Sequence, residues 1–99
     1  MKRRVRVLRR AQIDLLEIQA YVTRDKPTAA DRLVEALLDR LRGLETLSER
    51  GAVPKDSGLG RAGYRYLRHG EYLIFYKVLA SQVRFYRVLH GRRLFKPLL

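Results

Sequence analysis

The spacing of apolar residues divides the first part of the chain into a short strand and a helix. Val5 to Leu8 alternate weakly, which predicts a strand. From Ala11 onward, apolar residues recur at helical spacing and predict a helix that ends at Asp25-Lys26-Pro27, because the residue before a proline avoids the α region. The buried stripe of this helix is expected to contain Ala11, Leu15, Ile18 and Val22, widened by Leu16 and Ala20.

A second helix is predicted between Thr28 and Gly51. Thr28 is expected to cap it, with Asp31 three residues later in a variant of the capping box, and Gly51 is expected to end it. Its buried positions are expected to be Leu33, Leu37, Leu41 or Leu44, and Leu47, with Val34 and Leu38 alongside. Two helices with so short a connection predict a helical hairpin, whose apolar stripes need a sheet face as a partner.

The last third of the chain predicts a loop followed by three strands. Prolines and glycines mark residues 52–63 as the loop. Strands are expected at Tyr64–Arg68, Tyr72–Leu79 and Val83–His90, with turns at His69-Gly70 and Ala80-Ser81; the second is the most apolar and should lie centrally. Strict alternation on the last strand places Val83, Phe85, Arg87 and Leu89 on one face. The prediction is one α+β domain over residues 1–99, ordered β-α-α-β-β-β, with the helical hairpin packed on a small, mostly antiparallel sheet.

The net charge of +12 is concentrated at the two ends of the chain. Residues 1–10 carry +6 and residues 61–99 carry +8, whereas residues 11–60 carry −2. This distribution predicts one cationic face and an anionic partner, although a domain that is merely very basic remains an alternative. The sequence contains no cysteine and no long apolar run, so we expect a cytoplasmic protein without a disulfide, a thiolate zinc site or membrane association.

Motifs for metal, cofactor or nucleophilic chemistry are not visible in the sequence. His69 and His90 are the only histidines, and nine of the ten acidic residues lie in the helical middle, where solvated faces explain them. No metal and no cofactor are therefore predicted. What remains is a set of basic and aromatic residues that could support phosphate contacts and base stacking, although the tyrosines are equally typical of half-buried strands. The set comprises Tyr64, Arg65, Tyr66, Arg68, Tyr72, Tyr76, Lys77, Arg84, Tyr86, Arg87, Arg92 and Arg93.

An ordered series of short segments resembles a known family over nearly the full length. The segments are residues 11–21 and Ala29-Ala30 on the helices, then Tyr64-Arg65-Tyr66-Leu67, residues 71–76 and Val88-Leu89-His90-Gly91-Arg92-Arg93 on the strands. Together they are similar to toxins of the ParE/RelE superfamily of bacterial type II toxin–antitoxin systems. The last segment resembles the ParE branch in particular, although Leu94 stands where an acidic residue often follows this motif.

The two branches of that superfamily imply different functions. ParE-type toxins poison DNA gyrase by binding, whereas RelE-type toxins cleave mRNA in the ribosome. Tyr64 and Tyr66 stand where the RelE pattern has lysines, Leu73 stands where it has an arginine, and Leu99 falls near its terminal tyrosine. The resemblance therefore favours a gyrase inhibitor that acts without catalysis and is neutralised by a ParD-like antitoxin with a ribbon-helix-helix DNA-binding part.

Two alternatives stay open, and several residues are candidates for partner contact. One alternative is a ribosome-dependent endoribonuclease with a cationic site, and the other is a plain nucleic-acid-binding module. The endoribonuclease site would comprise Arg65, Arg68, Arg87 and Arg93. The candidates for contact with the target or the antitoxin are Arg65, Arg68, His90, Arg92, Arg93, Phe95 and Lys96. The tail Leu94–Leu99 is expected either to dock on the protein's own core or to form part of a contact surface. An acidic antitoxin would associate quickly with so basic a toxin.

Overall fold

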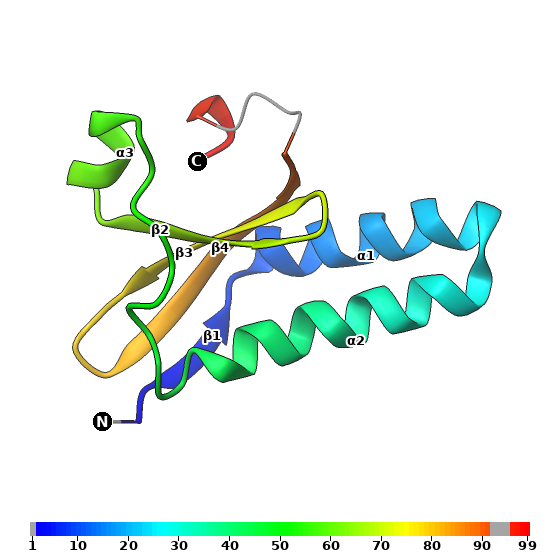
Figure 1. Ribbon diagram of the computed structural model, residues 1–99, viewed down its shortest axis with the longest axis horizontal. Coiled ribbons are helices and arrows are strands. Elements are labelled where there is room, and N and C mark those ends of the chain that lie inside the picture. The colour runs from blue at the N-terminus through cyan, green and yellow to red at the C-terminus, as the bar shows by residue number, and fades with distance from the viewer. Residues whose placement is uncertain (1, 92–95) are drawn as a thin grey trace.

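The computed structural model describes residues 2–91 and 96–99 and shows a helical hairpin beside a four-stranded sheet (Figure 1). The elements in chain order are β1 (Arg4–Val7), α1 (Arg9–Asp25), α2 (Pro27–Gly43), α3 (Ser57–Arg61), β2 (Tyr64–His69), β3 (Tyr72–Val78), β4 (Gln82–His90) and a 3₁₀ helix at Lys96–Leu98. This order confirms the predicted α+β class, to which the structure adds the short helix α3 inside the predicted loop. No helix in the described part of the chain has the length and apolar content needed to cross a membrane.

The sheet has the strand order β1-β4-β3-β2 and is antiparallel except at one pair. β1 runs parallel to β4, while β4 pairs antiparallel with β3 and β3 with β2. The most apolar strand, β3, lies inside the sheet as predicted. The turn between β2 and β3 consists of Gly70 and Glu71, one residue later than expected, and Gly70 has a φ of +58°. A two-residue hairpin turn with glycine at its first position requires a positive φ at that glycine.

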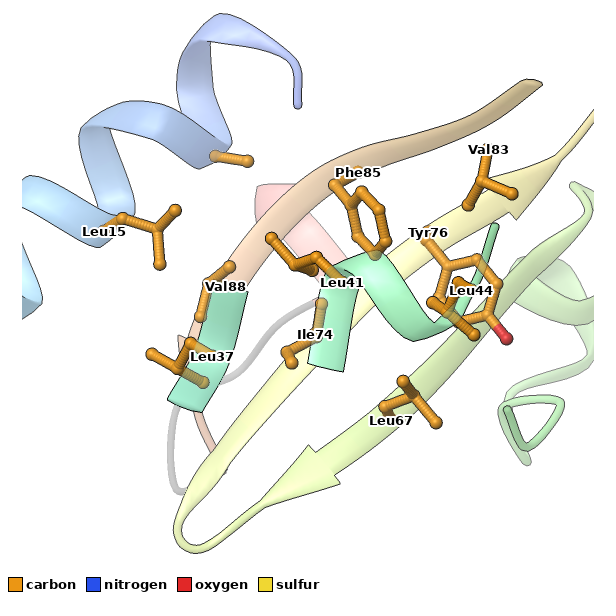
Figure 2. Close-up of a cluster of buried hydrophobic side chains, with 11 residues drawn as sticks. Leu15, Leu37, Leu41, Leu44, Leu67, Ile74, Tyr76, Val83, Phe85 and Val88 are labelled. Carbon is orange, nitrogen blue, oxygen red and sulfur yellow. The ribbon is translucent and has the colours of Figure 1, made fainter. Parts of the chain in front are cut away.

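The hairpin of α1 and α2 covers one face of the sheet and builds the larger core (Figures 1 and 2). Figure 2 shows leucines of α1 and α2 facing side chains of β3 and β4. The described members of this cluster are Ala11, Leu15, Leu37, Leu41, Leu44, Leu67, Ile74, Tyr76, Val83, Phe85 and Val88. Burial of so many large apolar side chains supplies most of the driving force for packing the hairpin onto the sheet.

Several predicted details of the helices are wrong. α2 begins at Pro27 rather than after Thr28, because proline fits the first helical turn, where its missing N–H costs nothing. α2 ends at Gly43, and the chain then turns, so Leu47 is exposed rather than buried. On α1, Leu16 and Ala20 are also exposed, since only one side of the helix meets the sheet.

A second, smaller core lies on the opposite face of the sheet. Leu73, Phe75 and Leu89 are buried there, and Leu59 of α3 packs against them. Leu98 and Leu99 of the C-terminal segment also pack against this cluster, so both α3 and the chain end lie over this face (Figure 1). The sheet therefore has a helix-covered face and a second face that is only partly covered.

The predicted alternation on β4 is wrong beyond Tyr86 because the strand contains a bulge. Phe85 pairs with Tyr76 and Arg87 pairs with Phe75, so Tyr86 is an extra residue on β4. An inserted residue shifts the alternation of every residue after it. As a result Val88 joins Val83 and Phe85 on the helix-covered face, and Leu89 belongs to the second face.

Candidate partner-binding site

A buried ion pair joins the first helix to the last strand. α1 begins two residues after β1, which places its first turns over β4, and the Asp14 carboxylate there is almost completely buried. Arg87 donates two hydrogen bonds to it, from Nε to Oδ2 at 2.8 Å and from Nη2 to Oδ1 at 3.0 Å. The backbone N–H of Val88 donates a third, at 3.0 Å. The hydrogen bonds that Arg87 donates to Asp14 raise the pKa of Arg87, and burial opposes this effect.

This ion pair also holds the end of the chain. The Arg87 Nη1 donates to the backbone oxygen of Leu98 at 3.0 Å, so one guanidinium ties together α1, β4 and the C-terminal segment. The expectation that Asp14 lies on a solvated face is wrong, because its side chain is buried. The position of Asp14 in the sequence could have indicated its burial, because Asp14 lies between Ala11 and Ile18 at the helical spacing of the buried stripe.

Next to this ion pair, a cavity of about 670 Å³ opens between α1 and the ends of β3 and β4. Carboxylates from both sides line it, together with tyrosines and a histidine. The lining residues are Asp14, Glu17, Ile18, Tyr21, Glu71, Tyr72, Val88 and His90. His90 Nε2 lies 3.1 Å from the Glu71 Oε2, and the rings of His90 and Tyr72 meet edge to face at 5.7 Å. Burial, and then the charge of Glu71, raise the pKa of Tyr72. The sequence-predicted candidate His90 therefore lies in an acidic cavity rather than on a cationic surface.

The structure does not bring Arg65, Arg68 and Arg87 together. Arg65 pairs across the sheet with Tyr76 of the helix-covered core, and its Nη1 donates to the backbone oxygens of Glu49 and Gly51 at 3.1 and 3.0 Å. Arg68 pairs with Leu73 on the second face and is exposed. Residues three positions apart on a strand point to opposite faces of the sheet, which separates Arg65 from Arg68. Arg87 is engaged by Asp14, and Arg93 lies outside the described residues.

Arg68 borders a cavity of about 230 Å³ on the second face. Lys55 lies on the same cavity, and Tyr66, Leu73 and Phe75 provide its apolar and aromatic walls. Asp56 is also on its edge, where its Oδ1 accepts a hydrogen bond from the N–H of Leu59 and caps α3. This cavity combines two cations with an aromatic wall and could accept an anionic group.

The remaining contact candidates lie at the chain end. Arg92, Arg93 and Phe95 fall outside the described residues, and Lys96 begins the C-terminal 3₁₀ helix. Leu98 and Leu99 pack on the second core, as expected if the tail docks on the protein itself. The role of all these residues as partner contacts stays a prediction. Within residues 2–91 and 96–99, His, Cys, Asp and Glu side chains do not gather into a group that could hold a metal ion.

An apolar groove runs along the outer side of the hairpin, where α1 and α2 meet the edge of β1. Its volume is about 300 Å³, and its lining residues are Val7, Gln12, Leu15, Leu16, Gln19, Val34 and Leu38. Leu16 at its rim is 64% exposed, so a large apolar side chain borders the other apolar groups at the surface. The groove has the character of a docking surface for an apolar segment.

The sequence of the chain matches a known protein family. Residues 5–95 match the family described as the ParE toxin of the type II toxin-antitoxin system parDE. The chain therefore belongs to the ParE toxin family. No curated protein sequence matches it.

Solved structures with the same fold include two toxin–antitoxin systems. One is the chromosomal ParDE system of P. aeruginosa, with a TM-score of 0.74, 17% sequence identity, and coverage of 90% of this chain and 96% of that chain. The other is the RelBE2 toxin-antitoxin complex of Mycobacterium tuberculosis, with a TM-score of 0.68, 22% identity, and coverage of 91% and 99%. At these identities the likeness concerns the fold.

Proposed function

We propose that this toxin inhibits DNA gyrase by binding to it, without catalysing a reaction, in the cytoplasm. The observation that carries the proposal is the match of residues 5–95 with the ParE toxin family. Inhibition by binding needs a rigid surface and no set of proton-transfer groups. The second face of the sheet offers such a surface, with the exposed Arg68 and the cavity beside it.

The side chains of the sheet are consistent with a binding role. RNA cleavage by attack of a 2′-hydroxyl needs a general base, a general acid and cations around the phosphate. Of the described candidates for those cations, Arg87 is held by Asp14, and Arg65 is held by two backbone oxygens. The runner-up, a ribosome-dependent endoribonuclease, is supported by Arg68 and Lys55, which together line one cavity.

The two functions can be separated with one protein preparation. Purified toxin is added to gyrase in a supercoiling assay and to ribosomes carrying a defined mRNA. We expect loss of supercoiling and intact mRNA. Arg68→Gln should weaken the inhibition of gyrase, while Arg24→Gln on the hairpin serves as a control with the same loss of charge, since Arg24 is exposed on a different element. Unchanged supercoiling, without trapped cleaved DNA, would contradict the proposal, and cleaved mRNA would favour the endoribonuclease.

We also propose that a ParD-like antitoxin, with a ribbon-helix-helix DNA-binding part, inserts an apolar segment into the groove between α1 and α2. The similar P. aeruginosa and M. tuberculosis structures belong to toxin–antitoxin systems, which supports a partner of this class. The groove offers apolar walls and an exposed Leu16, and the net charge of +12 would attract an acidic partner.

Leu16→Glu tests the groove. A charge at this apolar contact should weaken antitoxin binding by about tenfold or more, because an anchor residue contributes roughly 1.4–2 kcal/mol. Leu47→Glu is the matched control, since Leu47 is 60% exposed and does not line the groove. Equal affinities of the two variants in a calorimetric titration with the antitoxin would show that the segment binds elsewhere.

A further inference from the structure

The second face of the sheet carries a row of three cationic side chains on neighbouring strands. Arg6 on β1 pairs in register with Arg84 on β4, and Arg84 pairs with Lys77 on β3. Directly paired residues point to the same face of a sheet. That face is the second one, because the chain neighbours of these three residues pack in the helix-covered core: Val5, Val7, Tyr76, Val78, Val83 and Phe85.

The row places like charges next to one another on a rigid scaffold. Neighbouring strands are about 4.8 Å apart, and like charges directly opposite each other destabilise a sheet. Within residues 2–91 and 96–99, no carboxylate lies within salt-bridge distance of Arg6, Arg84 or Lys77. A repulsion that the described part of the fold leaves uncompensated indicates a surface suited to an anionic ligand.

Aromatic rings fix one end of the row. The Lys77 ammonium lies 4.4 Å from the ring centre of Tyr64 and 5.1 Å from that of Tyr86, and the two rings meet edge to face at 5.3 Å. Arg84 is held in turn by a 3.3 Å hydrogen bond from its Nε to the Gln82 side chain. The charges of Lys77 and Arg84 are thus positioned in advance, which lowers the entropy lost when a ligand binds.

The shape of this surface distinguishes between anionic ligands. A peptide partner gains most of its affinity from side chains that fill apolar pockets. None of the cavities described above is lined by Arg6, Arg84 or Lys77. A cationic row that lies outside those cavities, beside the half-buried ring of Tyr86, instead suits a phosphate backbone, which needs only charges at regular spacing. We propose that Arg6, Arg84 and Lys77 bind the phosphates of a nucleic acid directly.

The inference is tested with toxin and nucleic acid alone, so its outcome does not depend on whether gyrase is the target. Fluorescence anisotropy measures binding of a labelled DNA duplex of mixed sequence, and of a single-stranded RNA of equal length, over a range of salt concentrations. The variant Arg6→Gln/Lys77→Gln/Arg84→Gln is compared with Arg24→Gln/Lys26→Gln/Arg32→Gln. The control loses the same charge from exposed positions on the hairpin.

The row variant should bind about tenfold more weakly for each residue removed at about 0.1 M salt, and its log–log salt slope should fall by roughly one per residue. The control should lose much less. Equal losses in the two variants would mean that only net charge matters, and the proposal would be wrong. Comparison of the DNA and RNA probes then identifies which nucleic acid the row prefers.

Two further measurements guard the interpretation. The first is the affinity for polyglutamate. If polyglutamate binds as tightly as DNA of equal charge, and if the row variant loses affinity for both equally, the assignment to nucleic acid is wrong. The double variant Arg6→Gln/Arg84→Gln leaves Lys77 and its aromatic contacts intact, and it should unfold at a temperature at least as high as the wild type. A lower midpoint would show that the row stabilises the sheet, which contradicts the argument from repulsion.

Discussion

Removing the charge of Asp14 should destabilise the fold more than any other single charge change at the hairpin. In Asp14→Asn, the amide oxygen can still accept the hydrogen bond from Val88, but the Arg87 guanidinium remains buried without a counter-charge. Breaking a buried pair on one side typically costs about 3–5 kcal/mol. A domain of this size has a free energy of unfolding of roughly 5–15 kcal/mol, so the loss would be a large fraction of the total.

Urea unfolding, followed by circular dichroism, measures this loss from the shift in midpoint at constant slope. Glu17→Gln is a control on the same helix, because the Glu17 carboxylate is 59% exposed and lies 3.8 Å from Arg10. A surface pair of this kind contributes about 0–1 kcal/mol. A cost for Asp14→Asn no larger than that of the control would refute the reasoning.

The double variant Asp14→Asn/Arg87→Met separates the ion pair from the shape of the site. It removes the buried charge while leaving an acceptor for Val88, so it should be more stable than Asp14→Asn alone. The hydrogen bond from Arg87 to the Leu98 oxygen is lost in the double variant, so full recovery is not expected. A double variant less stable than Asp14→Asn would show that the guanidinium stabilises the fold without its carboxylate.

Three other changes test the packing of the sheet and its turns. Gly51→Ala should cost about 1–3 kcal/mol in urea unfolding, because its new Cβ would lie 2.8 Å from the backbone oxygen of Tyr66 and would collide with Tyr76; a neutral effect would mean that this loop moves freely. Burial raises the pKa of Tyr76 above its ordinary value of 10.0, so stability that is fully present below about pH 10 should be lost as the pH rises through the raised pKa, because the unfolded chain ionises first. Tyr76→Phe should reduce that alkaline loss and also cost about 1–3 kcal/mol near neutral pH, since the Gly51 N–H loses its acceptor; an unchanged alkaline slope would exclude Tyr76 as the cause. Gly70→Ala should cost about 1 kcal/mol because its φ is +58°, and Gly70→Asn should cost less; identical midpoints for the two variants would argue against strain at the turn.

Hydrophobic periodicity predicted the helices, because each helix buries one side and exposes the other. The stripe of Ala11, Leu15 and Ile18 faces the sheet, and Leu37 and Leu41 complete the hairpin core. The strand β3 was predicted instead from its continuous apolar run, because it is buried on both faces of the sheet. Each of these elements can be predicted from its own short segment of sequence, even though the residues that it contacts are far away along the chain.

What could not be predicted depends on contacts between distant segments. Asp14 and Arg87 are 73 residues apart, and a carboxylate on a helix ordinarily indicates a solvated surface. The bulge at Tyr86 moves Arg87 out of simple alternation, and no turn or breaker residue marks it. Arg65 and Arg68 looked like one cationic group because their charges are close in sequence, whereas the pleat separates them.

The parallel pairing of β1 with β4 also has a consequence for the timing of synthesis. Arg4 pairs with Gln82, so β1 receives its strand partner only after α1, α2, β2 and β3 have been made. Contacts this distant slow folding, because the intervening chain must first be brought together. Truncated translation products would lack the strand that carries Arg87 and could not complete the sheet. The sheet is therefore completed only in chains whose synthesis has passed β4.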